Sequence, residues 1–98
     1  MSFVPVGSVV GRNIRKNGVS QQVIIALAIE RAAIAMSAML GEGILDNARP
    51  LYIRQKTLNI ASLNAPASAA VGRVRDEIIT ATNQGAPYRL VERIRIIA

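Results

Sequence analysis

The sequence lacks several side chains on which active sites and covalent cross-links depend. Its 98 residues include no cysteine and no histidine, which excludes disulfides, thiolate metal sites and the usual general base. Only six residues are acidic, and apart from the neighbours Asp76 and Glu77 they are scattered along the chain. Adjacent residues on a helix diverge, so this pair is a poor acid–base couple. We therefore expect no enzymatic activity, no metal and no cofactor.

Negative charge is scarce beside positive charge. Twelve lysine and arginine residues stand against six aspartate and glutamate residues, a net charge of +6. A small basic domain favours a polyanionic partner, most often nucleic acid, or an acidic protein surface. The alternative interpretation is that the charge only keeps the protein soluble.

The sequence also lacks a recognisable targeting segment. Its start has no basic region followed by a long apolar stretch, as a signal peptide would. The segment from Val23 to Leu40 is strongly apolar, but Glu30 and Arg31 at its centre would each cost a few kcal/mol in a bilayer core. We therefore expect no membrane association and a cytoplasmic protein.

Periodicity and turn residues predict a single domain over residues 1–98. Ser20 can cap a helix over residues 20–40 that Gly41 ends, and Pro66 suits the first turn of a helix over 66–83. Alternating residues indicate three strands, and the last helix would connect two of them as a parallel crossover. The expected fold is α+β, in the order ααββαβ, with helices on one face of a three-stranded sheet. The expected helices cover residues 1–18, 20–40 and 66–83, the first one loosely held, and the expected strands cover 48–54, 57–63 and 89–97.

The helix over 20–40 is apolar around its whole circumference, which predicts burial on more than one side. Either the helix over 1–18 covers its outer face, or a second copy of the chain does. The second arrangement would be a homodimer through the helix that contains Val23 and Leu40.

The first two strands form a predicted hairpin. Their alternation pairs Leu51 with Ile60 and Ile53 with Leu58, which leaves residues 55–56 as a two-residue loop. Such loops require positive φ and prefer asparagine or glycine. The sequence there is Gln-Lys, so a longer or bulged turn is an alternative.

The sheet face opposite the helices is expected to be basic. Cations there could contact phosphates while one tyrosine ring stacks on a base. The alternative is a solvated sheet face whose charges discourage aggregation. The candidate nucleic-acid-binding residues on this face and at the hairpin tip are Tyr52, Arg54, Lys56, Arg93 and Arg95. A second basic cluster in the first helix consists of Arg12, Arg15 and Lys16.

The order of these elements resembles the DciA family of bacterial replicative-helicase loaders. The likeness covers about residues 5–97. It is carried by Met39-Leu-Gly-Glu42, by Asn47-Ala-Arg-Pro-Leu-Tyr-Ile53, by Thr57-Leu-Asn-Ile60 and by Val91-Glu-Arg-Ile-Arg-Ile96, with an alanine-rich helix before the last.

The resemblance implies a fold similar to K-homology domains and a role in DNA replication. The expected partners are the replicative DNA helicase and, weakly, single-stranded DNA. An RNA-binding module of K-homology type and a structural dimerisation domain remain alternatives. The Gly-x-x-Gly loop of RNA-binding K-homology domains is absent from the sequence.

Overall fold

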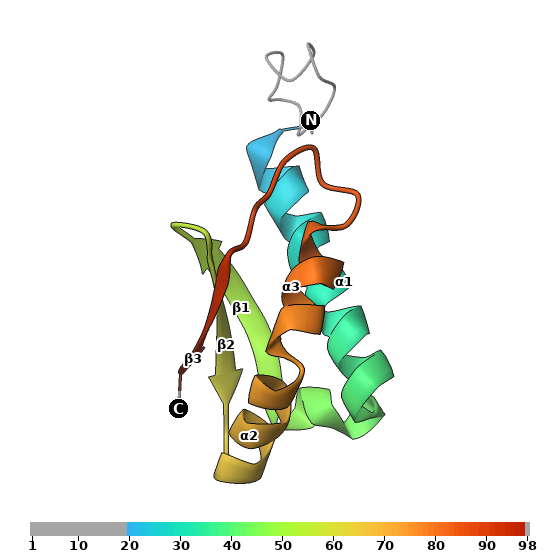
Figure 1. Cartoon of the computed structure of the whole chain (residues 1–98), viewed down its shortest axis with the longest axis vertical. Coiled ribbons are helices and arrows are strands. Elements are labelled where there is room, and N and C mark those ends of the chain that lie inside the picture. Colours follow the sequence, from blue (N-terminus) through green and yellow to red (C-terminus); the bar gives the residue numbers. More distant parts are fainter. Residues whose placement is uncertain (1–19, 98) are drawn as a thin grey trace, which may run out of the picture.

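A three-stranded sheet with helices packed on one face forms the fold, as the sequence predicts (Figure 1). The computed structural model describes residues 20–97, so the helix expected over 1–18 lies outside the described residues. The elements, in chain order, are α1 (Gln21–Leu40), the 3-10 helix η2 (Glu42–Asp46), β1 (Ala48–Arg54), β2 (Thr57–Ser62), α2 (Ala65–Arg73), α3 (Arg75–Asn83) and β3 (Arg93–Ile97).

Local signals at both ends determine the extent of α1. The Ser20 hydroxyl accepts a hydrogen bond from the Val23 amide at 3.2 Å, which caps the N-terminus as predicted. Gly41 has a φ of 97° and donates its amide to the Ser37 carbonyl at 2.9 Å. Glycine adopts positive φ without strain, so the helix ends there.

The sheet has the order β1-β2-β3, with β1 antiparallel to β2 and β2 parallel to β3. The parallel pairing confirms the predicted crossover through α2 and α3. Leu58 and Ile60 on the central strand are fully buried beneath the helices. Ile94 and Ile96 of β3 lie beside them in register, which completes the apolar layer.

One predicted pairing in the hairpin is wrong. Ile60 lies opposite Pro50 rather than Leu51, and the register shifts between Pro50 and Tyr52. This bulge leaves Leu51 outside the ladder and 47% exposed. Proline has no amide hydrogen to donate to the ladder, so an irregularity beside Pro50 costs little pairing.

The last helix and the last strand also differ from prediction. The helix is two helices, because Val74 has φ −113° and ψ 22° and separates α2 from α3. The strand begins at Arg93 rather than at residue 89. The Asn83 side chain accepts from the Leu90 and Val91 amides and donates to the Val91 carbonyl, each at 2.9 Å. These bonds hold the residues before Arg93 at the end of α3 instead of in the sheet.

The hairpin tip is the predicted two-residue loop. Gln55 has a φ of 51° and Lys56 a φ of 61°, and both are ordinary L-residues in the left-handed region. That region costs roughly 1–2 kcal/mol per residue because the Cβ approaches the following carbonyl. The tip is therefore strained, and its backbone is one for which asparagine and glycine are the favoured residues.

Relieving this strain should stabilise the protein. The double substitution Gln55→Asn, Lys56→Gly should raise the free energy of unfolding by about 1 kcal/mol, because both new residues tolerate positive φ. Urea denaturation measures the change. Gln55→Ala, Lys56→Ala is the control, since alanine keeps the Cβ and should give no gain. Equal stability of the two double variants would contradict the assignment of strain.

Candidate nucleic-acid interface

The strand register gathers the predicted site residues of the sheet into rows. Residues 57–61 of the central strand each have a partner on both sides, one from β1 and one from β3, whereas Ser62 pairs with β1 alone. Two such rows lie next to the hairpin tip. The first row consists of Arg54, Thr57 and Arg93, and the second consists of Tyr52, Asn59 and Arg95.

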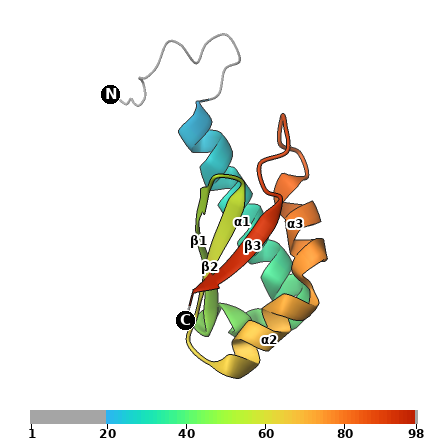
Figure 2. The ribbon, with the colours of Figure 1, turned by 60° about the vertical axis from the view of Figure 1, so that its left-hand side comes forward.

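Both rows point away from the helices. Side chains alternate between the two faces of a sheet, and Leu58 and Ile60, which are fully buried against the helices, occupy the alternate positions of β2. Asn59, at the centre of the second row, is itself only 4% exposed. The helices lie behind the sheet in Figure 2, and the rows belong to the face without helices. We call this surface the open face. It brings together the tyrosine and three of the arginines that the sequence singled out.

Positive charge dominates the open face and the hairpin tip. Arg54, Lys56, Arg93 and Arg95 are all exposed. Neighbouring strands lie about 4.8 Å apart, so Arg54 and Arg93 start about 10 Å from each other across the sheet. Cations at this spacing reinforce one another's attraction for a polyanion along the surface.

Sequence reasoning missed one group beside these cations. The Glu92 carboxylate lies 3.6 Å from the Lys56 amine and 3.8 Å from the Arg93 guanidinium. The Arg93 guanidinium also donates to the Gln55 carbonyl at 3.2 Å. The sequence did hold a signal, because Glu92 is the only carboxylate within residues 47–63 and 88–97.

The bulge also changes the position of a further cation. Simple alternation along β1 would place Arg49 on the helix side with Leu51. In the observed register Arg49 instead pairs with Ala61, whose position alternates onto the open face. Its guanidinium donates to the Leu45 carbonyl at 3.0 Å. This hydrogen bond keeps the Arg49 side chain near the start of β1, at the end of the strand away from the hairpin tip. The predicted cluster of Arg12, Arg15 and Lys16 lies outside the described residues.

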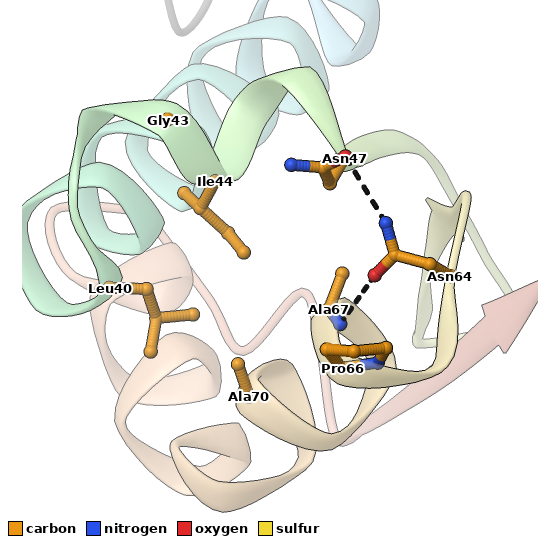
Figure 3. Close-up of a pocket in the computed structure, with 8 residues that line it drawn as sticks. All are labelled: Leu40, Gly43, Ile44, Asn47, Asn64, Pro66, Ala67 and Ala70. Atoms are coloured by element: carbon orange, nitrogen blue, oxygen red, sulfur yellow. Dashed lines mark hydrogen bonds between the residues drawn. The ribbon is translucent and has the colours of Figure 1, made fainter.

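An open groove lies elsewhere in the fold, between the end of α1, η2 and the start of α2 (Figure 3). It measures about 490 Å³, and most of its lining is apolar. The Asn64 side chain caps α2 by accepting from the Ala67 amide at 2.9 Å, and it donates to the Asn47 side chain at 3.2 Å. Its lining residues are Leu40, Gly43, Ile44, Asn47, Asn64, Pro66, Ala67 and Ala70. None of the predicted cations lines it.

Helix α1 carries a second exposed surface, which is apolar. Its buried residues are Ala28, Ala32 and Met36, whereas Leu27 is 46% exposed and Ile34 is 63% exposed. By length and composition alone the helix could cross a membrane. It packs against α3 and β1 of a compact fold, however, and is not a clear membrane span.

Comparisons with known proteins do not assign the chain to a family. No protein-family model matches it, and no curated protein does so significantly.

Proposed function

We propose that this protein is a non-enzymatic DNA-replication accessory domain of the bacterial cytoplasm, which binds single-stranded DNA weakly on its open face and also binds the replicative helicase. The alignment of Arg54, Arg93 and Arg95 with Tyr52 on that face supports the DNA-binding part. The resemblance to the DciA family supports the part that concerns replication and the helicase.

The chemistry of the open face suits a single strand. Guanidinium groups neutralise phosphates and release their counterions, which supplies affinity without regard to sequence. Tyr52 is 44% exposed in the same row as Arg95, and its ring offers a surface for base stacking. A base can reach such a ring only when it is unpaired, so single strands are favoured over duplexes.

A titration with single-stranded DNA tests the proposal. Three or four phosphate contacts give a slope of log K against log salt of roughly −2 to −3. Affinity should therefore fall about 15- to 60-fold between 50 and 200 mM salt. RNA of the same length and sequence is the comparison. Affinity that does not change with salt would contradict phosphate contact, and a clear preference for RNA would favour the RNA-binding alternative.

The helicase part needs its own experiment. Purified replicative helicase should be retained by the immobilised protein in the absence of DNA. A variant with the open-face arginines replaced serves to separate the two activities. Loss of DNA binding with retained helicase would place the two partners on different surfaces, whereas no retention by the unaltered protein would remove the helicase from the proposal.

The apolar surface of α1 favours a second candidate function, a homodimer through this helix. A helix normally turns its larger aliphatic side chains to the core, but α1 exposes Leu27 and Ile34 while two of its three buried residues are alanines. A second copy would remove these side chains from water. Sedimentation equilibrium decides the matter, because a monomer across the micromolar range would exclude the dimer and leave this surface to another segment or partner.

A further inference from the structure

Glu92 contacts two of the cations beside the hairpin tip, Lys56 and Arg93. One carboxylate oxygen lies 3.6 Å from the Lys56 amine on the tip, and the other lies 3.8 Å from the Arg93 guanidinium at the start of β3. These are the ion pairs formed within residues 20–97. One carboxylate therefore contacts two cations that come from different parts of the chain. A phosphate group bound to the same two cations would occupy its place.

The carboxylate is not needed to hold the tip in place. The Lys56 carbonyl accepts from the Glu92 amide at 2.8 Å and from the Arg93 amide at 3.2 Å. The Gln55 carbonyl accepts from the Arg93 guanidinium at 3.2 Å. Main-chain groups and Arg93 thus fix the strained tip, and the Glu92 side chain adds only charge.

The four basic side chains of this surface consequently divide into two pairs. Arg54 and Arg95 form no hydrogen bond and no ion pair through their side chains within the described part of the chain, whereas Lys56 and Arg93 are in contact with Glu92. All three members of the Glu92 cluster are well exposed, with side-chain exposures of 56%, 61% and 42% for lysine, arginine and glutamate. Exposed ion pairs of this kind are weak and exchange readily.

We propose that Glu92 is an intramolecular competitor of phosphate, which occupies Lys56 and Arg93 in the free protein and leaves them when the polyanion binds. This inference rests on the proposed function of the open face. Arg54 and Arg95 make the first contacts, and Lys56 and Arg93 join once phosphate replaces the carboxylate. Glu92 then limits affinity for single-stranded DNA without preventing binding.

The substitution Glu92→Gln tests the inference. It keeps the side chain's size, removes its charge and should raise affinity for single-stranded DNA about 3- to 10-fold at low salt. The salt slope should change by less than about 0.7, the contribution of one phosphate contact, because the same cations contact phosphates in both proteins. Glu77→Gln is the matched control, since it removes the same charge from an exposed position on α3 and should change neither quantity appreciably.

A double substitution separates competition from a general gain in positive charge. Lys56→Ala should weaken binding several-fold in the Glu92→Gln protein and clearly less in the unaltered protein, where the lysine must leave Glu92 before it contacts phosphate. If Lys56→Ala weakened binding equally in the two proteins, Glu92 would not compete with phosphate. Equal affinity of the Glu92→Gln and Glu77→Gln proteins for DNA would contradict the proposal as well.

The failure of this inference can be told apart from the failure of the proposed function. If neither the unaltered protein nor the Glu92→Gln protein binds DNA, the open face is not a DNA site. Inorganic pyrophosphate is then the probe, followed through the NMR signals of the Lys56 and Arg93 side chains. Tighter pyrophosphate binding by Glu92→Gln would still support competition, and unchanged binding would refute it.

Discussion

Replacing Asn83 by alanine should lower the free energy of unfolding by roughly 2–3 kcal/mol. Its side chain makes three hydrogen bonds to the main chain of Leu90 and Val91, which are buried residues. Each bond contributes about 1 kcal/mol, and main-chain groups left without a partner cost more than the bond itself. Because these bonds also set the point at which β3 begins, the variant should lose order in residues 84–92 first.

Urea denaturation measures the loss, and two variants serve as controls. Gln84→Ala alters the next residue, which is exposed, and should change stability by less than about 0.5 kcal/mol. Asn83→Asp keeps the acceptor for both amides but loses the donor to the Val91 carbonyl, so its loss should lie between the other two. If Asn83→Ala were as stable as Gln84→Ala, the contacts of Asn83 would not hold this loop.

Replacing Arg54 and Arg95 together by alanine should weaken binding of single-stranded DNA roughly 50-fold at 50 mM salt. The expectation follows from two lost phosphate contacts, each of which releases counterions from the single strand. The salt slope should become shallower by about 1.4 for the same reason. Both side chains are exposed and form no intramolecular bond within residues 20–97, so the melting temperature should stay the same.

A matched pair of arginines controls for net charge. Arg73 and Arg75 flank the junction of α2 and α3, are exposed and lie on elements that cover the other side of the sheet (Figure 1). Their double replacement by alanine removes the same two charges and should cost less than about threefold in affinity. Similar losses from the two double variants would mean that DNA responds to overall charge and not to the open face.

The features that sequence reasoning predicted are those with local causes. Ser20 and Gly41 mark the ends of α1 through side-chain capping and positive φ, which depend on a few neighbouring residues. The parity of Ile53 and Leu58 fixed the two-residue tip. The α+β class followed from the order of such elements, and the open face followed from the alternation of Arg93 and Arg95 on the last strand.

The features that sequence reasoning missed depend on contacts between distant segments or on small differences in free energy between two local backbone conformations. Asn83, ten residues earlier in the chain, determines where β3 begins. The alternation of apolar residues along the strand gives no indication of this contact. The break at Val74 falls inside the segment 66–83 that the sequence predicts as one helix. The bulge at Leu51 moved Arg49 to the opposite parity, and the contacts of Glu92 required the parallel pairing of β2 with β3. The roles assigned to these residues in binding stay predictions.

The packing of α1 has a consequence for the thermodynamics of unfolding. Its buried side consists of Ala28, Ala32 and Met36, while Leu27 and Ile34 are already in contact with water in the folded state. Unfolding therefore exposes less new apolar surface from this helix than its composition alone would indicate. The heat-capacity change and the denaturant m-value scale with the surface newly exposed. The isolated chain should show a broad denaturant transition and a shallow curve of stability against temperature. A second copy or other partner that covers the exposed side of α1 should raise both the m-value and the heat-capacity change.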